Sequence, residues 1–247
     1  MDHQTHQGAP AHIPPGGLPA KPSRPRKRHR GRWILISAAA LVVLLVAAVA
    51  LFIKLQPTQP PLALPASPAS APAGPLSGTW QAAPGSVAGF RVQESALGFS
   101  NDVVGRTSSV SGTLTISGGQ VTHAVFRVEL TAITVNGKTQ PQVANSLGTQ
   151  ADPTATFTLS GPVTAGTTFA SGATITRTAA GQLTMHGVTR PATVTITGRR
   201  DGTAIQLAGS IPVSFSAWGI RPPGGLGFFG SLADHGIAEF LLILHRV

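Results

Sequence analysis

Apolar and polar residues alternate one for one in short runs that recur from about residue 78 to the C-terminus. In Ser109–Ser117, Leu114 and Ile116 face one way, and serines and threonines face the other. This two-residue period is typical of a strand with one buried face. No long run after residue 55 has the helical period of 3.6 residues. The pattern predicts an all-β domain of some eight to ten antiparallel strands, as a sandwich or an up-and-down barrel.

The chain before this domain divides into three segments of different composition. Residues 1–32 form a basic tail without periodicity, which we expect to be disordered. Residues 33–55 form an apolar segment, interrupted by a single serine within 33–53, that matches the ~20 residues needed to cross a bilayer as a helix. Residues 56–77 are rich in Pro, Ala and Ser and predict an extended linker that acts as a spacer. Residues 78–247 are the β domain.

The charge distribution sets the expected topology. The formal net charge is +10, and seven of the 18 Lys and Arg residues lie in residues 21–32. This excess next to the apolar span predicts a cytoplasmic N-terminus, an extracytoplasmic C-terminal domain and a single-pass membrane protein. The basic cluster also offers a contact for anionic headgroups. Because the domain itself carries little excess charge, we expect no nucleic-acid partner.

A cleaved signal peptide is the alternative to an uncleaved anchor. The apolar run is longer than the 7–15 residues usual for a signal peptide, and the first small-residue cleavage site, Ala69-Ser70-Ala71, lies well beyond it. We therefore expect a signal anchor. The chain contains no cysteine, which excludes disulfides and thiol chemistry.

One nine-residue stretch carries a specific motif. Residues 183–191 read Leu-Thr-Met-His-Gly-Val-Thr-Arg-Pro and place a His-Gly turn between two alternating runs. They resemble the L-T-x-H-G-V-T-[RK]-P signature of the YceI-like family, and Trp80, residues 152–157 and residues 217–220 follow in the family's order. The chain departs from the family at residues 138–141, where an Arg-Asp pair is common.

The resemblance implies a lipocalin-like barrel of about eight strands that binds a polyisoprenoid lipid, such as a quinone, in its interior. The residues expected to line this interior are Phe90, Val92, Leu114, Ile116, Phe126, Val128, Phe157, Leu159, Leu183, Val194, Ile196, Val213, Phe215, Trp218 and Phe240. Gly89 and Gly112 are expected to leave gaps in the wall. The alternative is a filled core, in a structural or interaction module of the cell envelope.

The rim of the barrel is expected to carry His186 together with Leu226, Phe228 and Phe229. The last three lie in a glycine-rich loop that acts either as a lid over the mouth or as a plug that buries the rings.

Signatures of enzymes and metal sites are missing from the sequence. The domain's histidines, His123, His186, His235 and His245, lack the spacing of metal ligands, and its acids are scattered. The pair Asp234-His235 is the most suggestive polar group, although a turn before the last strand is the favoured interpretation of it. We expect no catalytic residues, no metal and no cofactor beyond a bound isoprenoid lipid or quinone.

Overall fold

The computed structural model describes residues 59–66, 69–96, 99–222 and 230–247, together with residues 41, 43, 44, 47, 48 and 51. The chain divides into two units, Met1–Ala48 and Val49–Val247, and all the strands belong to the second. The strands are β1 (Gly78–Ala82), β2 (Val87–Ala96), β3 (Phe99–Thr107), β4 (Val110–Ser117), β5 (Gln120–Glu129), β6 (Thr134–Val135), β7 (Thr154–Leu159), β8 (Val163–Thr164), β9 (Ile175–Met185), β10 (Val188–Asp201), β11 (Ala204–Ser214), β12 (Gly230–Leu232) and β13 (His235–Arg246).

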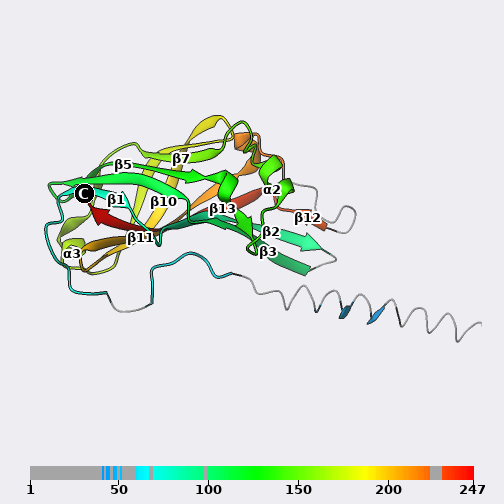
Figure 1. Ribbon diagram of the computed structural model, residues 1–247, viewed down its shortest axis with the longest axis horizontal. Coiled ribbons are helices and arrows are strands. Elements are labelled where there is room, and N and C mark those ends of the chain that lie inside the picture. The colour runs from blue at the N-terminus through cyan, green and yellow to red at the C-terminus, as the bar shows by residue number, and fades with distance from the viewer. Residues whose placement is uncertain are drawn as a thin grey trace, which may run out of the picture. The chain divides into compact units, whose positions relative to one another are not determined.

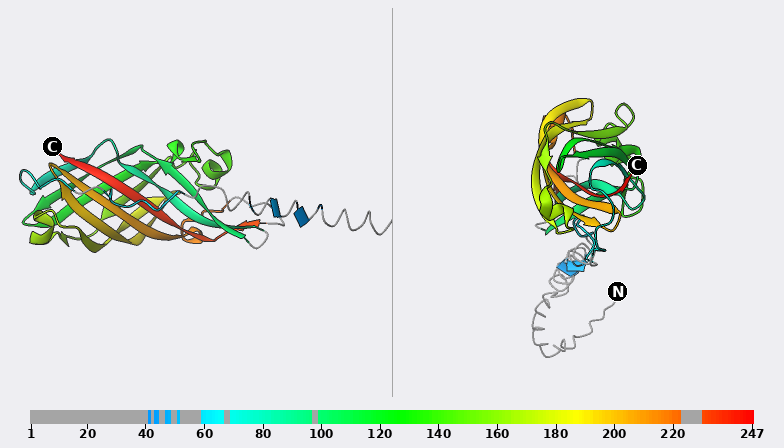
Figure 2. Two further views of the ribbon diagram at one scale, coloured as in Figure 1. Left: turned by 90° about the horizontal axis from the view of Figure 1, so that it is seen from below. Right: turned by 90° about the vertical axis from the view of Figure 1, so that its left-hand side faces the viewer.

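These strands form one antiparallel barrel, which confirms the all-β prediction. The eight strands of the barrel lie in the order β1-β4-β5-β7-β9-β10-β11-β13, and β13 closes the barrel by pairing with β1. Figure 2 shows the ring end-on in its right panel. The short helices lie at the barrel ends and between strands, as α2 (Pro141–Ser146), α3 (Gly166–Ala170), η1 (Leu130–Ala132) and η2 (Phe215–Trp218).

β1 and β2 together occupy one position in the barrel, as a long strand that is interrupted between them. β13 pairs with β1 near its C-terminal end and with β2 further back. At the break, Ser86 replaces the missing ladder bonds, because its hydroxyl donates to the carbonyl of Ile243 (3.2 Å) and accepts from the amide of Ile243 (3.0 Å). The side chain is 2% exposed, so these bonds form inside the wall. The bonds keep the barrel closed where the chain bends.

The motif at residues 183–191 folds as the expected hairpin. Met185 pairs with Val188, which leaves the two-residue loop His186-Gly187. Both loop residues have positive φ, 52° and 69° respectively. This geometry is that of a type I′ turn, which matches the twist of the two strands and is tolerated by glycine at its second position.

β3 carries no alternating apolar set in its first half, because Ser100-Asn101-Asp102 is polar. β11 is one continuous strand that ends at Ser214. Phe215 lies in η2 rather than in a strand.

The described part of the Pro-rich segment follows the outer surface of the barrel as a strap (Figure 1). Four arginines donate to its carbonyls: Arg91 to Gln59 (2.7 Å), Arg106 to Pro60, Arg199 to Pro65 (2.9 Å), and Arg200 to Ala73 (2.8 Å) and Gly74 (2.9 Å). A proline-rich chain makes no internal hydrogen bonds, so its carbonyls are free to accept these. The expectation of a spacer that extends away from the domain is therefore wrong for residues 59–66 and 69–74, although the linker boundaries themselves stay predictions.

Most of the predicted membrane span, residues 33–55, lies outside the described residues. Its described members, including Leu41, Leu44 and Leu51, are helical and exposed. Within the described part of the chain, no helix combines the length and apolar character needed to cross a bilayer. The membrane anchor remains a prediction.

Candidate functional site

The barrel encloses a cavity of about 220 Å³. Its wall is made almost wholly of apolar side chains. They come from β2, β4, β5, β7, β9, β10, β11 and β13, together with Leu130, Ile133 and Leu147 from the segment between β5 and β7. For comparison, a cavity of roughly 150 Å³ lined by similar residues stays dry and holds a benzene molecule. The interior is therefore hollow, with room for about nine carbon atoms of an apolar guest by that proportion.

Phenylalanines lie flat against the wall because glycines on the neighbouring strands make room for their rings. A Cβ atom added at any of these glycines would collide with a ring atom of its phenylalanine. Such ring-over-glycine packing stabilises sheets that bend. It also keeps the rings out of the barrel axis, where they would otherwise fill the space. The pairs are Phe90 over Gly105, Phe126 over Gly112, Phe157 over Gly181 and Phe240 over Gly209.

Gly89 and Gly112, which were expected to leave gaps in the wall, both lie where a neighbouring strand comes close. A Cβ at Gly89 would collide with the carbonyl oxygen of Gly105, and one at Gly112 would collide with that of Val125. Both glycines are sites of close backbone approach. Gly89 lies on the cavity wall, whereas the missing side chain at Gly112 makes room for the ring of Phe126.

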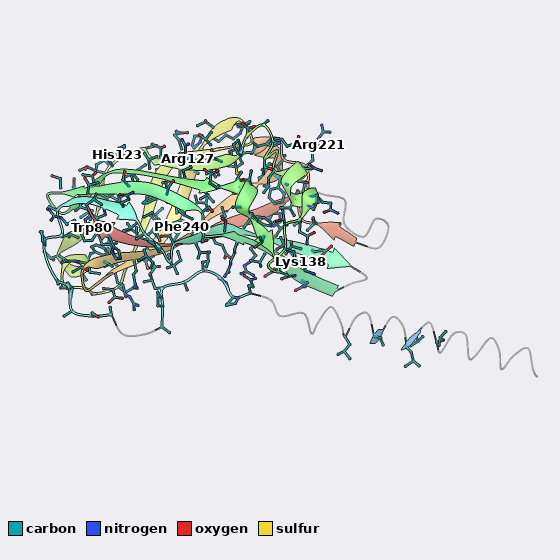
Figure 3. The ribbon with its side chains drawn as sticks, viewed as in Figure 1. Trp80, His123, Arg127, Lys138, Arg221 and Phe240 are labelled. Carbon is teal, nitrogen blue, oxygen red and sulfur yellow. The ribbon has the colours of Figure 1, made fainter. Side chains whose placement is uncertain are left out.

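Eleven of the fifteen residues predicted inside the barrel lie on the cavity wall. They are Phe90, Leu114, Ile116, Phe126, Val128, Phe157, Leu159, Leu183, Val194, Ile196 and Phe240. Figure 3 marks Phe240 along the barrel and Trp80 nearer the end that carries the C-terminus. Their contact with a ligand stays a prediction.

The other four predicted residues do not line the cavity. Val213 and Trp218 belong to a packed cluster with Ile220, and Phe215 packs against it. The indole of Trp218 donates to the carbonyl of Leu183 (3.3 Å), which seals this end of the barrel. Val92 is 7% exposed and lies off the cavity wall.

His186 lies in the β9–β10 hairpin, at the end of the barrel that also carries η2. Its Nδ1 atom lies 2.9 Å from the carbonyl oxygen of Trp218, and its ring lies close to Gly148. This position fits a structural role for the ring in holding η2 against the hairpin. The other predicted rim residues, Leu226, Phe228 and Phe229, lie outside the described residues.

Several cavity residues escaped the sequence reasoning. Ile133 and Leu147 sit in short irregular segments next to η1 and α2, where a two-residue period gives no signal. Phe169, which is 4% exposed, enters from α3. Small inward residues such as Ala155 also line the wall and were findable from the alternation of Ala155, Phe157 and Leu159.

A charged cluster lies on the outer side of the wall, beneath the strap. Glu239 is 4% exposed, and its carboxylate accepts from Arg106 (2.9 Å), from Arg91 (3.5 Å) and from the amide of Leu62 (3.4 Å). Arg91 also binds Asp102 (2.9 Å). The two arginines and the amide donor compensate the cost of burying the carboxylate of Glu239. The bond to the amide of Leu62 holds the strap on the barrel.

The Asp234-His235 pair lies at the surface. Nδ1 of His235 is 2.8 Å from a carboxylate oxygen of Asp234, and both side chains are largely exposed. The hydrogen bond and the charge of His235 lower the pKa of Asp234. No group of three or more potential metal ligands occurs in the described part of the chain.

Comparison with known domains identifies the fold family. The YceI-like domain family matches residues 80–236, which is more than half of the chain. The chain belongs to the YceI-like family. Its signature residues 183–191 form the hairpin that bounds the sealed end of the barrel. A search of curated proteins gave no significant match.

Two solved structures are similar to this YceI-like domain. A polyisoprenoid-binding domain from Saccharophagus degradans, implicated in plant cell wall breakdown, matches with a TM-score of 0.54 and 16% identity, over 69% of this chain and 99% of that domain. BcnA of Burkholderia cenocepacia matches with a TM-score of 0.47 and 20% identity, over 62% of this chain and 95% of that one. The similarity to the first of these structures is a similarity of fold.

Proposed function

We propose that this YceI-like barrel binds the apolar tail of an isoprenoid-type lipid in its interior and acts without chemical turnover. The observation that carries the proposal is the hollow, apolar interior of about 220 Å³. Family membership and the polyisoprenoid-binding domain of the same fold supply the chemical class of the ligand. A filled barrel would have supported a scaffold of the cell envelope instead.

The size of the cavity bounds the part of the lipid that the barrel holds. Room for about nine carbons corresponds to nearly two prenyl units, and burial of nine carbons contributes up to ~7 kcal/mol before the cost of association. A longer polyisoprenoid therefore buries its first units in the cavity and leaves the remainder outside, unless the wall moves.

We further propose that the barrel works outside the cytoplasm on a chain anchored by residues 33–55. The proposal rests on the length of the apolar span, the basic cluster before it and the topology rule for positive charge. The exposed apolar side chains Leu41, Val43, Leu44 and Leu51 are consistent with a lipid environment for this segment. A protease-accessibility assay on intact cells would test it, because a cytoplasmic barrel would stay protected.

Displacement of a fluorescent apolar dye tests the binding proposal. We expect the full chain, held in a bulky steroid detergent, to take up the dye and to release it when farnesol is added. A glucoside of similar size to farnesol should not release the dye. Absence of dye uptake, or release by the sugar as readily as by farnesol, would contradict an apolar site.

A further inference from the structure

Two residues of the cavity wall are exposed at the surface of the domain. Among the described residues that line the cavity, Thr164 and Arg177 are exposed, and every other one is buried or partly buried. They are also bonded to each other, since Nε of Arg177 donates to the carbonyl of Thr164 (3.2 Å). A side chain that is both exposed and part of the cavity wall marks a place where the cavity comes close to solvent.

The strand pairing explains why the wall opens here. β7 pairs with β9 only along Gly181–Thr184, and β8 pairs with β5 instead of β9. In the described part of the chain, the first half of β9 is joined to the 160–164 segment by one backbone bond, from Ser160 to Ala180 (3.0 Å), and by Arg177. This stretch, which we call the seam, is an interruption of the ladder in addition to the break between β1 and β2.

Arg177 occupies an inward position of its strand. It lies between Ile175 and Ala179, which both line the cavity on the same face. Its Nε and Nη1 atoms donate to backbone carbonyls, those of Thr164 and Thr176 (2.9 Å), and no ion pair joins it to a carboxylate in the described ranges. The positive charge of Arg177 is thus left available at the seam.

Glu239, the other charged residue of the cavity wall, does not offer a free charge to a ligand. Glu239 is held on the outer side by Arg91 and Arg106. Arg177 is therefore the positive group that an amphiphile would meet at the edge of the cavity. Its planar guanidinium donates in pairs to phosphate oxygens, a geometry that a point charge cannot match.

We propose that Arg177 binds the phosphate headgroup of an isoprenoid lipid whose tail fills the cavity. This inference rests on the proposed function, because it needs the tail inside the barrel. The seam lets the doubly charged phosphate stay in contact with water while its prenyl units are buried. The phosphate then keeps its hydration, and the prenyl tail keeps its apolar surroundings.

A matched pair of lipids and a matched pair of variants test this assignment. Farnesyl phosphate and farnesol share a tail and differ in the headgroup, so the ratio of their dissociation constants isolates the headgroup contribution. Arg177→Gln removes the charge at the seam. Arg127→Gln removes the charge of an exposed arginine on β5, labelled in Figure 3, which is not part of the cavity wall. Dye displacement on the full chain gives all six constants.

We expect the wild type to bind farnesyl phosphate about tenfold more tightly than farnesol, as one charged hydrogen-bonded contact at a partly solvated site would give. Arg177→Gln should lose this preference and keep its affinity for farnesol, and Arg127→Gln should retain both values. Arg177→Lys should keep part of the preference, since it keeps the charge without the fork. Raised salt should reduce the preference in the wild type.

Three outcomes would overturn the assignment. The wild type could bind the two lipids equally, which would point to a neutral headgroup. Arg177→Gln could lose both lipids to the same extent, which would indicate a structural role at the seam, and its melting temperature would show the same loss. If neither lipid displaces the dye from the wild type, the proposed function fails first and the inference falls with it.

Discussion

Enlarging one inward alanine separates a hollow barrel from a filled one. Ala155 lies on β7, lines the cavity and is partly buried. Ala155→Leu adds three carbons that point into empty space, and burial at ~0.8 kcal/mol per carbon predicts a gain of up to about 2 kcal/mol. In a filled core the same change would overpack the interior and cost ~1–3 kcal/mol. The two accounts therefore predict opposite signs.

The chain offers two matched controls for this substitution. Ala208, on β11, is 5% exposed and is not part of the cavity wall, so Ala208→Leu should destabilise by ~1–3 kcal/mol. Ala180, on β9, is exposed, so Ala180→Leu should have little effect on stability. The three variants share one chemical change and differ in the space around it.

Urea unfolding followed by tryptophan fluorescence measures the effect. With a slope of ~2 kcal/mol per molar urea, a gain of about 2 kcal/mol raises the midpoint by about 1 M. Ala155→Leu should also weaken farnesol binding, because the leucine takes the ligand's place. A drop in the midpoint of Ala155→Leu as large as that of Ala208→Leu would refute the reasoning.

Four further perturbations follow from the same geometry. Gly105→Ala should push the ring of Phe90 into the cavity and weaken lipid binding, and the double variant with Phe90→Ala should restore it; dye displacement reports both. Arg200→Ala removes the donor to two strap carbonyls and to Ala170, so we expect a loss of about 2–4 kcal/mol in urea unfolding and faster cleavage of the strap by elastase. Affinity for prenyl alcohols should rise from five to ten carbons and then level off, as a competition series would show. His235→Gln should leave the melting temperature unchanged near neutral pH, because the pair that lowers the pKa of Asp234 is fully exposed to solvent.

The sequence predicted the barrel wall well where one face of a strand is buried. The alternation of apolar residues in Ser109–Ser117 reproduces the inward set of β4, and the His-Gly pair reproduces the turn between β9 and β10. Both patterns depend only on neighbouring residues, so they can be recognised without knowledge of the rest of the chain. β3 escaped because its first half is polar.

The interior was harder to predict from sequence than the wall. Alternation shows which side chains point inward, but it does not show how far they reach toward the axis. The flat packing of Phe126 depends on its neighbour across the ladder, Gly112, which is far away in sequence. The seam at Arg177 depends on where β7 stops pairing, and that is a property of three strands together.

The strap was misread for a related reason. Composition alone predicts an extended chain, and residues 59–66 and 69–74 are extended. Its partners are arginines on β2, β3 and β10, and nothing in the composition of a Pro-rich segment indicates that its free carbonyls will find donors on the same chain.

Mass spectrometry of the lipids that co-purify with the full chain tests the central idea most directly. The protein would be isolated from its own cells in a bulky steroid detergent and extracted with organic solvent, beside the Ala155→Leu variant. We predict one prenyl lipid in near-stoichiometric amount with the wild type and a marked depletion with the variant. An extract free of prenyl lipids, or one equally rich in them from both proteins, would contradict a ligand held inside the barrel.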